Sequence, residues 1–201
     1  MSKKLKLKTG IDGFDHISHG GLPRLRATLV AGTAGSAKTL FAAQFLAAGI
    51  RQFDEPGVFV TFEETPDDIR ENLEGFGWDV RDWESSKKWK FVDVSPDVDD
   101  ETFISGDFEL SVIITRISHA VAEIGAKRLV LDSLGALFAQ IDDAHIVRRE
   151  LFAIASALKR MGVTSIVTAE RHSDYGSIAR FGVEEFVADN VVVLRNPLEL
   201  E

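Results

Sequence analysis

Cysteine is absent from this chain of 201 residues. The absence excludes disulfides, thiolate metal sites and cysteine nucleophiles together. Apolar runs long enough to cross a bilayer are also missing, because the longest one, Phe41–Ile50, is interrupted by Gln44. The basic stretch 1–8 has neither the apolar core nor the cleavage site of a secretory signal. We therefore expect a cytoplasmic protein with no membrane contact.

An excess of positive charge is lacking as well. The chain has 23 Lys and Arg against 32 Asp and Glu, a net charge of −9. Proteins that bind nucleic acids normally present a basic face that neutralises phosphates. The densest basic cluster beyond the N-terminus, Lys87-Lys88-Trp89-Lys90, is expected to be a solvated loop. The charge balance therefore argues against a nucleic-acid partner.

What the chain does contain is an alternation of short β-branched runs and longer helical patterns. The predicted strands are 28–31, 58–62, 91–94, 128–132, 163–168 and 190–194. The predicted helices are 38–50, one that begins at Pro66 and ends at Gly75 or Gly77, 110–124 and 146–161, and the acidic stretch 95–109 is expected to be a long surface loop. Such alternation is typical of an α/β fold with a mostly parallel twisted sheet and helices on both faces. We expect residues 1–201 to form one domain.

A glycine-rich turn, Gly32-Thr-Ala-Gly-Ser-Ala-Lys38-Thr39, joins the first of these strands to its helix. Backbone N–H groups of such a turn and the N-terminus of the following helix attract phosphate. We expect Lys38 to reach the β- and γ-phosphates and the Thr39 hydroxyl to complete a magnesium shell. The expected nucleotide ligands are Gly32, Thr33, Ala34, Gly35, Ser36, Ala37, Lys38, Thr39 and Leu40. The alternative is a turn that binds nothing.

Ala37 departs from the P-loop pattern G-x-x-x-x-G-K-[ST], in which its position is a glycine. A Cβ there is harmless if φ is negative, whereas a Cβ that crowds the phosphates weakens binding. Backbone sterics favour the tolerated form, with negative φ.

Carboxylates lie at or directly after the ends of two predicted strands. Asp132 ends the strand 128–132, where an acid can hold magnesium through water; a helix cap is the alternative. Glu63 and Glu64 directly follow the strand 58–62, and the carboxyl ends of parallel strands face the ligand crevice. Either glutamate could polarise and orient an attacking water, and we expect at least one to be catalytic. The alternative is a pair of solvated charges before a helix.

With these motifs placed, the chain resembles the KaiC family of circadian clock ATPases, specifically their N-terminal RecA-like domain. The resemblance runs over the whole length and includes Thr9–Asp15, Gly20–Pro23, the P-loop, Phe53–Pro66, Phe76–Trp78, Val147–Phe152 and Gly182–Asn190. It implies a RecA-like P-loop fold, slow magnesium-dependent ATP hydrolysis, a hexameric ring with nucleotide between subunits, and nucleotide-dependent binding of the clock protein KaiB. By motif match, Lys38 and Thr39 are nucleotide ligands, Glu63 and Glu64 the catalytic glutamates, and Asp132 the Walker-B acid.

Departures from the family qualify this picture. The second domain of the family is a kinase that phosphorylates adjacent Ser and Thr residues, and the matching stretch here, 178–182, contains neither. We therefore expect the hydrolytic domain and not the kinase domain. Leu25 and Ala37 replace glycines of the family. The chain also ends at Glu201, before a strand-rich segment that contacts the neighbouring subunit's nucleotide, so we expect a domain truncated at its C-terminal end.

Other functions remain open at this point. A nucleotide-responsive binding module with negligible turnover is favoured by Ala37 and by the missing C-terminal segment. A DNA-dependent ATPase on the same RecA-like fold would need DNA-binding loops, yet the region after Thr168 is poor in basic residues and offers only Tyr175 for stacking. The acidic stretch 95–109 is either a partner surface, near where KaiB docks by resemblance, or an ordinary loop.

Overall fold

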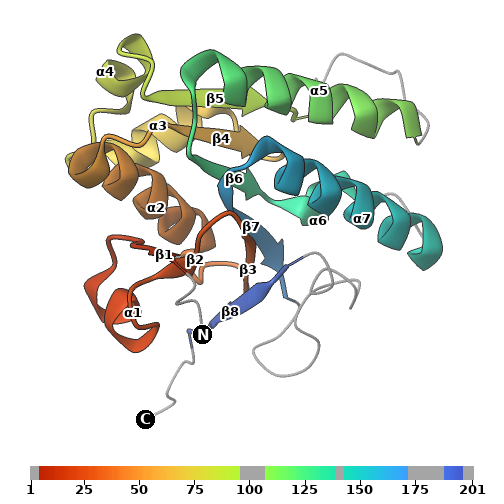
Figure 1. The fold of residues 1–201 in the computed structure, drawn as a ribbon, viewed down its shortest axis with the longest axis horizontal. Coiled ribbons are helices and arrows are strands. Elements are labelled where there is room, and N and C mark those ends of the chain that lie inside the picture. The colour runs from red at the N-terminus through yellow and green to blue at the C-terminus, as the bar shows by residue number, and fades with distance from the viewer. Residues whose placement is uncertain (1–4, 96–106, 139–142, 172–187, 197–201) are drawn as a thin grey trace.

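The central feature of the fold is a parallel sheet of six strands (Figure 1). The computed structural model describes residues 5–95, 107–138, 143–171 and 188–196. Within them the strand order is β5-β4-β6-β7-β3-β8, and every neighbouring pair is parallel. The strands are β3 (Ala27–Gly32), β4 (Gly57–Thr61), β5 (Trp89–Asp93), β6 (Arg128–Asp132), β7 (Thr164–Glu170) and β8 (Asn190–Leu194). The predicted RecA-like α/β class, a mostly parallel sheet with helices on both faces, is confirmed.

Helices cover both faces of this sheet (Figure 1). One face carries α2 (Lys38–Phe53), α3 (Pro66–Glu74) and α4 (Val80–Ser85), and the other α5 (Asp107–Ile124), α6 (Leu134–Leu137) and α7 (Ala144–Met161). A small unit of α1 (Asp12–Ile17) and the antiparallel strands β1 (Lys6–Leu7) and β2 (Leu22–Pro23) lies beside α2 (Figure 1). None of the helices in the described part of the chain is long and apolar enough to cross a membrane.

Two hydrophobic cores result from the alternation of side chains along the strands. In β4, Val58 and Val60 face α5 and α7, whereas Phe59 faces α2. In β6, Leu129 and Leu131 take the first side and Val130 the second. Strands covered on both faces read as continuous apolar runs, which is why these segments were recognisable in the sequence.

Differences from the sequence prediction concern short elements and one basic cluster. The helices α1, α4 and α6 and the strands β1 and β2 were not predicted. The cluster 87–90 was expected to be a loop, but Trp89 and Lys90 belong to β5 and Trp89 is buried. The expected loop 95–109 is wrong at its end, because α5 begins at Asp107, and its residues 96–106 lie outside the described part.

Candidate nucleotide site

The candidate site lies at the carboxyl edge of the sheet, where the predicted functional segments converge. Gly32 at the end of β3 is in register with Glu170 of β7, and Thr61 of β4 with Asp132 of β6. The strand β7 separates β3 from β6. The loop after β3 and the carboxylates after β4 and β6 therefore lie at one edge, as expected for an open α/β sheet.

The loop between β3 and α2 has the backbone of an anion cradle. The N–H of Ser36 and the Lys38 ammonium both donate to the Thr33 carbonyl, at 3.2 and 2.8 Å. Gly35 and Ala37 have left-handed backbones, with φ of 74° and 63°. Backbones with residues in this conformation turn successive N–H groups toward one concave side. The side chain of Lys38, the first residue of α2, thus lies against this loop with its ammonium on the Thr33 carbonyl.

Ala37 differs from the sequence expectation. A negative φ was expected, but its φ of 63° lies in the left-handed region that favours glycine. A Cβ in that region costs about 1–2 kcal/mol. Leu25, which the resemblance also places where the family has a glycine, has a φ of 56°. Both substitutions therefore keep the glycine-like backbone and bear its strain.

A cavity of about 260 Å³ lies between this loop and α3. It is lined by Gly35, Ala37, Lys38, Thr39, Leu40, Glu64, Ile69, Asn72, Leu73 and Phe76. The structure thus brings the predicted residues Lys38, Thr39 and Glu64 to one space. The opposite wall is apolar at Leu73 and Phe76, and the Phe76 ring is 51% exposed, so it can receive a flat ligand group.

The two adjacent glutamates have different surroundings. Glu64 lines the cavity and accepts a long hydrogen bond of 3.4 Å from the Asn72 amide. Partial burial raises the pKa of Glu64, and the negative charges of Asp132, Asp68 and Glu63 raise it further. Glu63 instead accepts a hydrogen bond of 3.1 Å from the Ser133 hydroxyl, just after β6.

Asp132 is oriented by the neighbouring strand, because the Thr168 hydroxyl of β7 donates to its Oδ1. Thr168 itself is fully buried. The oxygens of Asp132 and Thr39 are of the kind that Mg²⁺ prefers. Within the described ranges no group of three or more His, Cys, Asp or Glu residues could hold a metal ion. The Asp132 carboxylate and the Thr39 hydroxyl thus have the chemistry that a Mg²⁺ ion bound with a phosphate would require.

Several residues of this site were missed by the sequence reasoning, namely Asn72, Leu73, Phe76, Ser133 and Thr168. Asn72 and Leu73 lie on α3 and Phe76 follows two residues after its end, so this end of the helix could have been assigned to the crevice. Thr168 is a polar residue inside an apolar strand, which is also a usable signal. The predictions for the stretch 178–182, for Tyr175 and for most of 95–109 and 182–190 concern residues outside the described part of the chain.

Comparison with known proteins decides the family. The family model described as "ATPase: KaiC" matches residues 7–200. The chain belongs to the KaiC ATPase family. It is 58% identical to the circadian clock protein KaiC3 of Synechocystis over 96% of its length, and 53% identical to the circadian clock oscillator protein KaiC of Prochlorococcus marinus over 98%. It covers only 38% and 39% of those two relatives, in their N-terminal half.

KaiC membership assigns the chain to the ATP-binding, ATPase-type domains of circadian clock proteins.

The motif Thr9–Asp15, which contributes to the resemblance, has a structural role in this chain. The Asp15 carboxylate accepts hydrogen bonds from the N–H groups of Thr9 and Gly10, at 2.9 and 3.0 Å. The Gln44 amide of α2 donates to the Gly10 carbonyl at 3.1 Å. The motif therefore fixes the N-terminal unit against α2, and through α2 the start of the site.

Proposed function

We propose that this KaiC-family chain binds ATP together with Mg²⁺ at the cavity between the P-loop and α3 and hydrolyses it slowly. The observation that carries the proposal is the convergence of Lys38, Thr39 and Glu64 on that one cavity, with Asp132 at the same edge of the sheet. Family membership supports the nucleotide and the ATPase class, and the geometry supports the residues.

Each residue has a defined task in this proposal. The N–H groups of the loop 32–40 and the Lys38 ammonium bind the phosphates, and an incoming phosphate replaces the Thr33 carbonyl as partner of Lys38. When bound, Mg²⁺ would neutralise charge on the transferred phosphoryl group, and Thr39 and, through water, Asp132 would hold it. Glu63 or Glu64 orients the attacking water and accepts its proton. Phe76 stacks on the base.

The size of the cavity supports a site that a second surface completes. A cavity of about 260 Å³ falls below the roughly 300–1,000 Å³ of pockets that enclose a drug-sized ligand. We therefore propose that the nucleotide lies between subunits of a ring, a hexamer as the resemblance implies. We also propose that nucleotide state governs this assembly and the binding of a KaiB-type clock protein, and that in the whole protein the domain precedes a C-terminal kinase domain.

Nucleotide titration with matched variants tests the binding half of this proposal. Lys38→Met should weaken ATP binding by about 100-fold, because it removes the cation that faces the phosphates. Arg51→Met, an exposed residue at the far end of the same helix, should leave the affinity unchanged. Equal ATP affinity of Lys38→Met and the parent would contradict the proposed site. Mass measurement in ATP and in ADP would test assembly.

A binding module with negligible turnover is the second candidate, and the strained Ala37 backbone in the P-loop favours it. Tight ATP binding without phosphate release would select it. A DNA-dependent ATPase has less support, because Lys88 and Lys90 of the basic cluster pair with Asp54 and Glu123 at 2.8 and 2.5 Å. Stimulation of phosphate release by single-stranded DNA would revive that function.

A further inference from the structure

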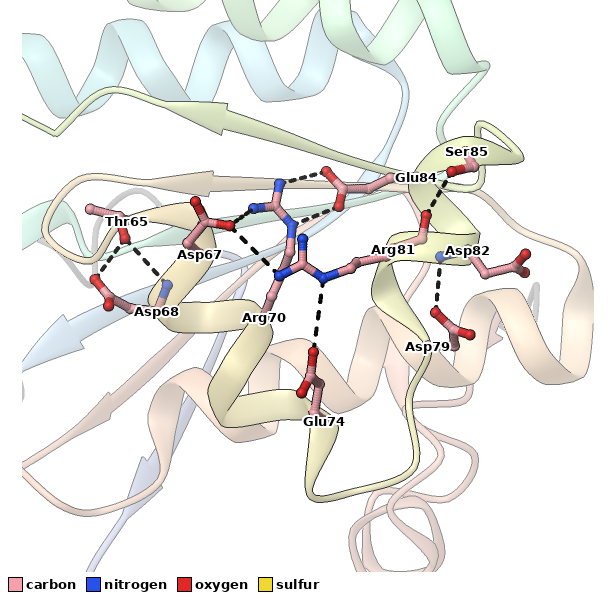
Figure 2. Close-up of polar contacts among 10 residues, drawn as sticks. All are labelled: Thr65, Asp67, Asp68, Arg70, Glu74, Asp79, Arg81, Asp82, Glu84 and Ser85. Atoms are coloured by element: carbon pink, nitrogen blue, oxygen red, sulfur yellow. Dashed lines mark hydrogen bonds and ion pairs between the residues drawn. The ribbon is translucent and has the colours of Figure 1, made fainter.

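The helix α3 has two faces that make different contacts. One stripe, formed by Ile69, Asn72, Leu73 and Phe76 at the start of the connection after the helix, lines the candidate nucleotide cavity. The other stripe, Asp67, Arg70 and Glu74, points toward α4 (Figure 2). Spacings of three and four residues place each set on one side of the helix. Whatever holds the second stripe therefore also sets the position of the first.

Arg70 makes the strongest contacts of that second stripe (Figure 2). Its Nε and Nη2 donate to the two carboxylate oxygens of Glu84 at 2.7 and 2.9 Å, and its Nη1 donates to Asp67 at 2.7 Å. The guanidinium also lies 4.9 Å from the centroid of the Phe91 ring in β5. Only 16% of the Arg70 side chain and 27% of the Glu84 side chain are exposed. Paired, planar contacts of this kind fix orientation as well as distance.

The Arg70–Glu84 pair brackets the connection that carries the apolar wall of the cavity. Its members are 14 residues apart, on α3 and α4, and residues 75–79 lie between these helices. In this connection Phe76 packs against the buried Trp78, with ring centroids 5.3 Å apart. Because one ion pair ties the helices on either side of this short connection, the backbone that carries Phe76 is held at the edge of the cavity.

We propose that Arg70 and Glu84 are positioning residues for nucleotide binding, which hold Phe76 and Leu73 where the base of ATP stacks. They touch neither the phosphates nor the reacting atoms. The inference rests on the proposed function, and assigns to this pair the share of affinity that comes from the base. It predicts that breaking the pair lowers the affinity for ligands that have a base and leaves the affinity for ligands that have only phosphates unchanged.

The test compares the affinity of the chain for ATP with that for inorganic tripolyphosphate, in Mg²⁺. Glu84→Gln keeps the shape of the side chain and removes its charge, and it should weaken ATP binding about tenfold, the range of one stacked base. Tripolyphosphate binding should change less than about twofold, because the P-loop is intact. Under turnover, KM for ATP should rise while kcat stays the same. Arg70→Lys, which keeps the charge but loses the paired contact, should give an intermediate loss.

Arg81→Gln is the matched control. Arg81 lies on the same surface, is 62% exposed and approaches Asp67 and Glu74 only at 3.9 Å, so its loss should alter neither affinity. Two results would overturn this inference and leave the proposed function standing. One is an equal loss of affinity for ATP and tripolyphosphate in Glu84→Gln, and the other is unchanged ATP affinity in a variant that unfolds cooperatively. A parent chain that binds neither ATP nor tripolyphosphate would overturn the proposed function, and this inference with it. If Glu84→Gln does not fold, Arg70→Lys decides by the same criteria.

Discussion

At the scale of single residues, function and stability compete within the candidate site. The P-loop has alanine in a left-handed conformation at residue 37, and Glu64 lies among the negative charges of Asp132, Asp68 and Glu63. Strained backbones and clustered like charges of this kind occur preferentially where ligands bind. Three predictions follow from individual side chains here.

Ala37→Gly should stabilise the chain by about 1 kcal/mol, since glycine adopts the observed φ of 63° without penalty. Denaturant unfolding measures the change. Leu25→Gly is the matched control, because Leu25 has a φ of 56° but lies in the turn between β2 and β3. It should stabilise similarly and leave ATP binding unchanged. A less stable Ala37→Gly variant would show that the left-handed backbone is not the source of strain.

Thr168→Val should lower the Mg²⁺ affinity of the site. The variant keeps the shape of the side chain and removes the hydroxyl that donates to Asp132. Loss of such an orienting hydrogen bond typically costs about 10–100-fold in metal affinity. The readout is the Mn²⁺ affinity of the ATP complex by electron paramagnetic resonance, beside phosphate release. Thr168→Ser should restore both. Parent-like Mn²⁺ affinity in Thr168→Val would refute the orienting role.

Glu64→Gln should stabilise the nucleotide-free chain at neutral pH. The raised pKa of Glu64 means that the folded state binds this proton more tightly than the unfolded state, so ionisation costs stability. The cost is absent below the ordinary value of 4.5 and complete above the raised pKa. The gain at about pH 7 should stay below about 1 kcal/mol, because the carboxylate is largely exposed, and should vanish at about pH 4. Glu71→Gln, also on α3 and exposed, is the matched control and should change the free energy of unfolding by less than about 0.5 kcal/mol.

At the scale of helices and strands, the sequence predicted the strands of the parallel sheet and the longest of the helices that the structure describes. The bounds of β6 and β8 match the prediction, and the N-terminus of α3 was found from Thr65 and Pro66, where the Thr65 hydroxyl accepts from the Asp68 N–H at 3.2 Å. The helices α1 and α4 have only 6 residues each, too few for helical periodicity to emerge. In α4 the Asp79 side chain accepts from the Asp82 N–H at 3.0 Å, a cap that the sequence could have suggested.

Contacts between elements were beyond the reach of the sequence. That Glu63 and Glu64 meet different partners, Ser133 and Asn72, depends on how α3 and β6 pack. The left-handed backbone of Ala37 likewise follows from the loop as a whole, because the residue type alone favours negative φ.

The buried Arg128 at the start of β6 contacts α2 and two connecting segments at the opposite edge of the sheet from the site. It pairs with Glu55 at 2.7 Å and donates to the carbonyls of Lys8 and Phe45 at 2.9 and 2.7 Å. Desolvation lowers its pKa, and the bonds to Glu55 oppose that effect.

Arg128→Met should lower the free energy of unfolding by about 3–5 kcal/mol, because it leaves two carbonyls without their donor and Glu55 with only the exposed Arg24, at 3.4 Å. Urea unfolding measures it. Arg26→Met, which removes a pair with Asp189 between side chains 45% and 32% exposed, should cost less than about 1 kcal/mol. Similar losses in the two variants would contradict the structural role of Arg128.

At the scale of the whole molecule, the carboxyl edge of a parallel sheet brings a P-loop, two glutamates and an aspartate to one candidate ATP site. The small size of the cavity favours the proposed arrangement, in which a second subunit completes the site. The central claim is hydrolysis, since binding alone would leave the chain a nucleotide-responsive module.

Phosphate release from ATP in Mg²⁺, measured for the parent and for the Glu63→Gln/Glu64→Gln double variant, tests that claim most directly. The parent should release phosphate steadily. The double variant should bind ATP at least as tightly as the parent. Its rate of phosphate release should be at most about one hundredth of the parent rate, because the groups that activate water are lost. Equal rates of phosphate release from the two chains would contradict the account.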